Sequence, residues 1–216
     1  MSAAALAPHF DLDALAPPRL HAEPPKLGDR RADLRGDHAL NAGSWTLPDG
    51  TPPRIAAVLI PIVAHPGGPT VLLTERAASL RQHSGQIAFP GGKMDPEDAT
   101  PRATALREAQ EEIGLEPALV RHLGYLDAYL SGTNYFIVPV LGLVAPGFRL
   151  AINRSEVESV FEVPLSFLLD EANHELHARE WRGAVRSYYA MPFGDRYIWG
   201  VTAGILRNLH ERLHAP

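Results

Sequence analysis

The sequence feature that most constrains this chain is a glutamate-rich helix that follows a Pro-Gly-Gly turn at residues 90–92. Pro101 suits the first position of a helix and Gly114 suits its end. Three acidic residues near that end are spaced i, i+3 and i+4: Glu108, Glu111 and Glu112. At 3.6 residues per turn they share one face of the helix. The fold therefore has to place three carboxylates side by side.

Like charges at this spacing destabilise an isolated helix by about 0.2–0.5 kcal/mol per pair. A bound cation reverses that effect, and Mg²⁺ and Mn²⁺ prefer oxygen ligands. The charge pattern alone also fits a solvent-exposed acidic helix face.

Three features favour the cation site. The glutamates lie in the last turn, where the helix dipole disfavours negative charge. The Gly91-Gly92 turn lets a backbone carbonyl approach a bound ion. An apolar stripe indicates that the helix is docked on a core, and it consists of Ala105, Leu106, Ala109 and Ile113.

This stretch resembles the Nudix box, a Gly-rich turn followed by a helix with the pattern Arg-Glu, aliphatic, any residue, Glu-Glu, any residue, Gly, aliphatic. Gly92 is the first Gly, and residues 107–115 (REAQEEIGL) match the helix half. The first half departs from the pattern, because Asp98 replaces a Glu and eight residues instead of seven separate it from Arg107. The resemblance implies Mg²⁺- or Mn²⁺-dependent hydrolysis of a nucleoside diphosphate derivative. It also implies the Nudix-type α/β/α sandwich around a mixed β-sheet, in agreement with the alternation of predicted strands and helices.

The resemblance implies a role for each residue of the box. Glu108 and Glu112 are the expected metal ligands, with Glu111 binding directly or through water and the Gly92 carbonyl completing the site. Arg107 is the fourth expected catalytic residue, and it pairs with a box carboxylate to fix its orientation. Asp98 orients the loop or that arginine. The general base is open: Glu156 and Glu158 are candidates, although their alternation with Val157 and Val160 favours solvent-facing strand residues.

Residues 72–92 (LLTERAASLRQHSGQIAFPGG) resemble the segment that precedes the box in coenzyme A pyrophosphatases. Coenzyme A carries a 3′-phosphate and a diphosphate, and Arg binds phosphate bidentately. The substrate-binding candidates are therefore Arg76, Arg81 and His83. Each has a structural alternative, an ion pair with Glu75 or another acid for Arg76 and bracing of the loop for the other two. The pantetheine arm is expected to bind in a groove with aromatic or aliphatic walls. The candidates for these walls are Trp181, Tyr188, Tyr189 and Trp199. The alternative is that these aromatic side chains pack in the core.

Two rival functions remain open. The first is another Nudix substrate, such as ADP-ribose or a dinucleoside polyphosphate. The second is a non-catalytic Nudix-fold ligand-binding module, which would be expected to have lost box carboxylates. All three glutamates are present here.

The chain divides into a Pro/Ala-rich N-terminal arm at 1–43 and a Nudix hydrolase domain at 44–216. Apolar runs predict four strands, at 54–63, 70–76, 122–130 and 135–144. A strand and a short helix are expected over 155–170, a hairpin over 176–190 and a closing amphipathic helix over 198–213.

Composition limits the function. A net charge of −5 over 216 residues argues against a nucleic-acid or membrane-surface partner. The chain has no cysteine, its start does not resemble a signal peptide, and no apolar run approaches the ~18 residues of a membrane span. The sequence predicts a cytoplasmic enzyme that acts on a small molecule of the coenzyme A type.

Overall fold

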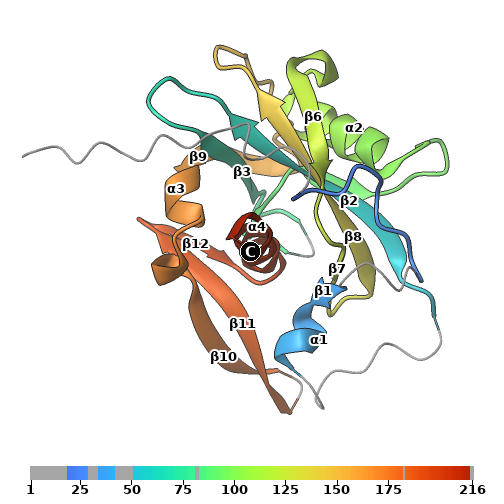
Figure 1. The fold of residues 1–216 in the computed structure, drawn as a ribbon, viewed down its shortest axis with the longest axis vertical. Helices are drawn as coiled ribbons and strands as arrows, with labels where there is room; N and C mark the ends of the chain where they lie inside the picture. The colour runs from blue at the N-terminus through green and yellow to red at the C-terminus, as the bar shows by residue number, and fades with distance from the viewer. Residues whose placement is uncertain (1–18, 29–33, 42–50, 81–82, 182, 215–216) are drawn as a thin grey trace, which may run out of the picture.

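A central mixed β-sheet carries the glutamate-rich helix of this protein (Figure 1). The computed structural model describes residues 19–28, 34–41, 51–80, 83–181 and 183–214. At the middle of the sheet, β2 (Arg54–Val63) pairs in parallel with β8 (Tyr135–Val144) at every position of both strands.

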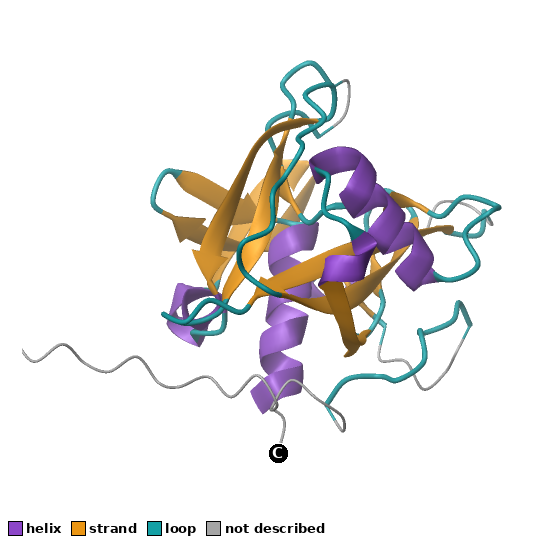
Figure 2. Cartoon of the chain, turned by 90° about the horizontal axis from the view of Figure 1, so that it is seen from above, coloured by secondary structure: helices purple, strands orange, loops and turns teal. Residues whose placement is uncertain are grey.

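Strand β2 is buried on both faces, as its continuous apolar sequence predicts. Its odd-numbered side chains, among them Leu59 and Val63, pack against α2 (Pro101–Ile113). Its even-numbered side chains, among them Ile60 and Ile62, pack in the core beneath α4 (Val201–His214). The two helices therefore cover opposite faces of the sheet (Figure 2), and the predicted α/β/α sandwich is confirmed.

The segment that leads into α2 is held between two central strands. Strand β2 pairs with β3 (Thr70–Arg76) at Ile62 and Val63, and the two strands then diverge. Residues 87–93 fill the opening, because β4 (Ile87–Ala88) pairs with β3 and β5 (Gly91–Lys93) pairs with β2. The Leu59 N–H also donates to the Pro90 carbonyl at 2.8 Å. The Gly91-Gly92 turn is thus fixed within the sheet, next to α2.

The remaining elements extend the sheet and add a second one. On the large sheet, β6 (Val120–Tyr125) and β7 (Tyr129–Leu130) pair with β8, β9 (Val157–Pro164) pairs with β3, and β1 (Arg35–Gly36) pairs with β7. A second, antiparallel sheet contains β10 (Glu175–Trp181), β11 (Ala184–Phe193) and β12 (Arg196–Trp199). It lies beside α4 (Figure 1). The short helices are α1 (Asp37–Leu40), α3 (Leu165–Leu168) and two 3₁₀ turns at Pro117–Leu119 and Glu171–Asn173.

Most predicted elements are confirmed, and two are corrected. The strand predicted at 122–130 is two strands, separated at residues 126–128. The closing helix begins at Val201 rather than at 198, because Gly200 adopts a left-handed conformation (φ 64°) that separates it from β12. Ile198 and Trp199 therefore belong to a strand.

The described parts of the N-terminal arm pack onto the body of the fold. The backbone of His21 exchanges two 2.9 Å hydrogen bonds with Tyr125. Asp127 is 2% exposed, and its Oδ1 lies 2.7 Å from both His21 Nε2 and Arg212 Nη2. Arg35 Nε approaches the other carboxylate oxygen at 3.7 Å. One buried carboxylate thus joins the arm to the closing helix. The predicted boundary at residue 43 itself lies outside the described residues.

Candidate active site

Helix α2 begins and ends where its sequence predicts. Thr100 caps the N-terminus, and its Oγ1 accepts a hydrogen bond from the Ala103 N–H at 3.1 Å. Gly114 closes the C-terminus in the left-handed conformation (φ 70°), with its N–H donating to the Gln110 carbonyl. The buried alanines of the helix face the core. Its glutamate face is thereby directed at β5.

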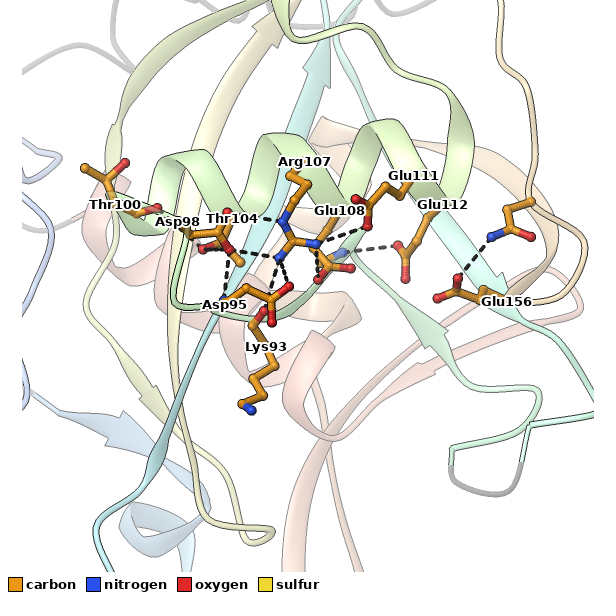
Figure 3. Close-up of polar contacts among 12 residues, drawn as sticks. Lys93, Asp95, Asp98, Thr100, Thr104, Arg107, Glu108, Glu111, Glu112 and Glu156 are labelled. Carbon is orange, nitrogen blue, oxygen red and sulfur yellow. Dashed lines mark hydrogen bonds and ion pairs between the residues drawn. The ribbon is translucent and has the colours of Figure 1, made fainter.

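Arg107 is the centre of the charged network on this face (Figure 3). Its Nε and Nη2 donate to the two oxygens of Asp98 at 3.1 and 2.9 Å, a bidentate pair. Its Nη1 lies 3.0 Å from both Glu108 Oε1 and Glu111 Oε2. The hydrogen bonds from Arg107 lower the pKa of Asp98 to about 2, and those to Asp98 raise the pKa of Arg107. Arg107 therefore fixes its neighbouring carboxylates, as predicted.

This network explains why the loop departs from the general box pattern. Asp98 also accepts from the Thr104 hydroxyl and from the Asp95 N–H, each at 3.0 Å. An Asp side chain is one methylene shorter than Glu, and the loop is one residue longer here. With this shorter acid and longer loop, the Asp98 carboxylate still pairs with Arg107.

Glu112 and Glu108 carry their charge with less compensation. Glu112 is 3% exposed, accepts from the Gly91 N–H at 3.2 Å, and has the Arg76 Nη1 at 3.9 Å. Its burial raises the pKa to about 7, and the charges of Glu108 and Glu156 add to that effect. Burial also raises the pKa of Glu108, against the opposing influence of Arg107. Burial thus disfavours the charged form of both carboxylates, and a bound cation would reverse that effect.

Gly92 allows the backbone of β5 to approach Glu108 closely. A Cβ at this position would lie 2.5 Å from the Glu108 carboxyl carbon, well inside contact distance. Any larger residue would displace that carboxylate. The absence of a side chain at 92 is therefore a requirement of this geometry.

These groups fit a divalent cation, but not as a set of three carboxylates. Glu111 is 57% exposed and turned toward Arg107, whereas Glu108 and Glu112 lie against β5. In the ranges that the structure describes, no three His, Asp or Glu side chains form a ready metal-ligand group. Mg²⁺ typically uses one or two protein carboxylates and takes its other oxygens from water and phosphate. Glu108 and Glu112 match that need, while a role for Glu111 through water stays a prediction.

The structure separates the two candidates for the general base. Glu156 precedes β9, is half-buried, and accepts from Asn153 Nδ2 at 3.0 Å. Its charge acts on Glu108 and Glu112, and Figure 3 shows it beside Glu112 on the side away from Arg107. The expectation of a solvent-facing strand residue was therefore wrong for Glu156. Glu158, on the strand, is exposed as expected.

The predicted substrate-binding residues have different surroundings. Arg76 reaches the carboxylates, and its buried Nε makes no hydrogen bond within the described structure. Its alternative partner Glu75 binds Arg196 instead. His83 is exposed in a left-handed turn (φ 58°), with Nδ1 2.7 Å from Gln86 Oε1, so it braces the loop. Arg81 lies outside the described residues.

The aromatic candidates fall on two faces of the second sheet. Tyr189 packs against the core, with the Arg207 guanidinium over its ring. Tyr188 and Trp199 are in edge contact with each other, with centroids 5.4 Å apart. The side chain of Trp181 lies outside the described residues. Sequence reasoning missed Tyr197, next to Trp199, because it did not predict β12. The signal was the turn residue Gly194 followed by a short strand-like run.

No helix in the described ranges is long and apolar enough to span a bilayer.

The model of the NUDIX domain matches residues 53–184. Two relatives share the description "Uncharacterized Nudix hydrolase NudL". The protein from Photorhabdus laumondii subsp. laumondii is 43% identical over 160 residues, 74% of this chain and 85% of its own length. That from Yersinia pestis is 41% identical over 74% of this chain and 80% of its own length. Among solved structures, the Nudix hydrolase RenU from M. smegmatis is 27% identical, covers 56% of this chain and 76% of its own, and has a TM-score of 0.44.

The fold and the carboxylate site thus agree with the sequence match. The chain belongs to the Nudix hydrolases, enzymes that cleave nucleoside diphosphate derivatives and generally use divalent metal ions such as Mg²⁺ or Mn²⁺.

Proposed function

We propose that this Nudix hydrolase cleaves the diphosphate of coenzyme A and its derivatives, yielding 3′,5′-ADP and 4′-phosphopantetheine or its acyl form. The observation that carries the proposal is the position of Arg76. It belongs to the 72–92 segment that resembles coenzyme A pyrophosphatases, and its guanidinium lies 3.9 Å from Glu112 of the box. The 72–92 segment, which we associate with the coenzyme A substrate, and helix α2 of the Nudix box therefore come together at Arg76 and Glu112.

The ion would be held by Glu108, Glu112 and the Gly92 carbonyl. A bound Mg²⁺ or Mn²⁺ neutralises phosphate charge and lowers the pKa of a coordinated water. Arg107 keeps Glu108 in place through its own anchorage on Asp98. The chain thereby presents oriented carboxylates before substrate arrives.

Two further residues act on the substrate side. Arg76 would donate from its guanidinium to a phosphate oxygen, because its side chain is 28% exposed and lies beside Glu112. Glu156 would accept the proton of the attacking water at Oε2, because Oε1 is already bound to Asn153. Glu158 is exposed on strand β9, so we do not assign it this role.

A product assay tests the proposal. The protein is incubated with coenzyme A and Mn²⁺, in parallel with ADP-ribose and a dinucleoside polyphosphate, and products are separated by chromatography. We expect 3′,5′-ADP and 4′-phosphopantetheine, with kcat/KM for coenzyme A exceeding that for the other compounds at least tenfold. Glu112→Gln serves as the inactive control.

A preference for ADP-ribose or a dinucleoside polyphosphate would replace the substrate but keep the enzyme class. Tight binding of these compounds with no turnover of any would support a ligand-binding module. If ADP-ribose or a dinucleoside polyphosphate is preferred, Arg76→Ala is expected to raise the KM for coenzyme A less than the KM for the preferred compound.

A further inference from the structure

A polar cavity of about 340 Å³ lies between the second sheet and the segment that leads into the box. Gly85 and Ile87 line one side, and Glu75 of β3 adjoins them. The opposite side comes from the β11–β12 turn and from β12: Asp195, Arg196, Tyr197 and Trp199. Of these residues, only Trp199 is predicted from the sequence as a candidate wall of a substrate groove, and that groove is the one expected for the pantetheine arm.

The aromatic wall of this cavity is held in place from behind. The Tyr197 hydroxyl lies 3.0 Å from His177 Nδ1 and 3.5 Å from the Tyr188 hydroxyl. The Tyr197 and Trp199 rings are 6.5 Å apart between centroids and tilted by 32°. Arg179 covers Trp199 with its guanidinium 5.1 Å from the ring centroid. The two rings thus form one aromatic surface whose members are held by polar and cation–π contacts, although Tyr197 remains 40% exposed.

The charges of the cavity favour a neutral ligand with hydrogen-bond donors. Arg196 is neutralised, because it binds Glu75, and Ser159 bonds to both. Asp195 is 93% exposed, with the Arg196 Nε 3.7 Å away. Two acids against one base leave an excess of negative charge, which disfavours a phosphate group. Carboxylates beside an aromatic surface instead suit a ring that carries an amino group.

The edge of β12 adds backbone groups to the same wall. Within the described part of the chain, β12 pairs with β11 and with no other strand. An edge strand exposes unpaired N–H and C=O groups, which can bond the edge of a planar base. The volume is near the lower limit for small-molecule sites, so the cavity holds one ring system rather than a whole dinucleotide.

The cavity is also connected to the proposed catalytic centre. Glu75 and Arg76 are consecutive on β3, and the Arg76 backbone bonds to both Gln86 and Gly85, at 3.0 and 3.1 Å. The carboxylates and the cavity therefore lie on either side of one strand end, around the turn at residues 83–86. A substrate with its diphosphate at Arg76 would have to pass around this turn to place one end in the cavity.

We propose that this cavity, with its Tyr197–Trp199 surface and Asp195, is the subsite for the adenine base of the substrate. The inference rests on the proposed function and adds the residues that select the base. Adenine stacks on the rings and donates its exocyclic amino group to Asp195. The less polar pantetheine arm binds elsewhere.

Equilibrium binding of a probe that carries the adenine base and of the other proposed product tests this subsite. AMP, which presents the base without the 3′-phosphate, and 4′-phosphopantetheine are titrated by calorimetry into the wild-type protein, Trp199→Leu and Asp195→Asn. We expect Trp199→Leu to raise the Kd for AMP about tenfold, in line with the contribution of base–aromatic stacking, and to change that for 4′-phosphopantetheine less than twofold. Asp195→Asn is expected to raise the Kd for AMP about threefold and to leave that for IMP, which lacks the amino group, unchanged.

Val185→Ala is the matched control, because Val185 is 66% exposed on the same sheet and outside the cavity. It should leave both Kd values unchanged. An unchanged Kd for AMP in Trp199→Leu, or a larger effect on 4′-phosphopantetheine, would overturn the assignment. Asp195 is on the surface, so its variant keeps the test valid even if Trp199→Leu folds poorly.

Binding and turnover separate the two proposals. If coenzyme A is hydrolysed but the Kd for AMP does not change in the Trp199 and Asp195 variants, the proposed base subsite is wrong and the proposed function stands. If AMP binding depends on these residues but coenzyme A is not cleaved, the proposed substrate is wrong and the base subsite stands.

Discussion

The carboxylates around Arg107 and the carboxylate of Glu112 differ in how their negative charge is compensated. Arg107 contacts Asp98, Glu108 and Glu111, and the pKa of Asp98 falls to about 2. Glu112, in contrast, is buried with its nearest guanidinium, that of Arg76, at 3.9 Å, and its pKa rises to about 7. The first group of carboxylates is neutralised by Arg107, whereas the charge of Glu112 is left with little compensation in the described structure. Glu108 belongs to both groups, because it contacts Arg107 and is also a ligand of the metal site that we propose.

The largest expected effect comes from Glu112→Gln. We expect kcat to fall about 10³-fold, because the variant removes a buried ligand of the proposed metal site. The free energy of unfolding without metal should stay equal or rise, because an undercompensated buried charge is lost. Steady-state kinetics and urea unfolding measure the two. Glu111→Gln, at an exposed position, should cost less activity, and an equal loss would restore the three-carboxylate site predicted from sequence.

Glu156→Gln is expected to lower kcat about 10²-fold, which is the scale of a lost general base. Glu158→Gln, two residues away and exposed, should remain within about twofold of wild type. Equal activity of the two variants would remove Glu156 from the mechanism.

Gly92→Ala should reduce kcat about tenfold. The new methyl group would displace the Glu108 carboxylate, which now lies 2.5 Å from that position. This carboxylate ends a flexible side chain, so the melting temperature should change little. Gly67→Ala is the control, because a Cβ there meets no atom within 4 Å. Full activity of Gly92→Ala would show that the close approach at β5 is dispensable.

Asp98→Asn should affect stability more than chemistry. Loss of hydrogen bonds to a charged group is expected to lower the free energy of unfolding by about 1.5–3 kcal/mol at pH 7. Because the folded pKa of Asp98 is depressed from 3.8 to about 2, its contribution is present above pH 4 and disappears as the pH falls toward 2. Unfolding measured at pH 6 and pH 3 should therefore show a smaller difference from wild type at pH 3. A constant difference would assign the effect to packing.

Local signals in the sequence were sufficient for α2 and the central strands. Pro101 and Gly114 fix the ends of the helix by backbone conformation, and continuous apolar runs identify strands that are buried on both faces. The pairing of Arg107 with box carboxylates followed from the resemblance. Each of these depends on residues close together in the chain.

The features that the sequence did not reveal depend on contacts between distant segments. Glu111 and Glu112 are indistinguishable by spacing, and their different burial is set by where β5 and Arg107 lie. Strand β12 has only four residues, too few for a periodic pattern, so Tyr197 and the cavity beside it were missed. Glu156 resembled a strand residue because the start of β9 was placed two residues too early.

Asp127 has a consequence for how the polypeptide can be shortened. It is buried at the junction of His21, Arg35 and Arg212, which come from opposite ends of the chain, and the matched family domain spans only 53–184. A fragment trimmed to residues 53–184 would keep Asp127 and lose all three of these basic partners. We therefore expect such a fragment to be less stable than a longer one that keeps both terminal segments.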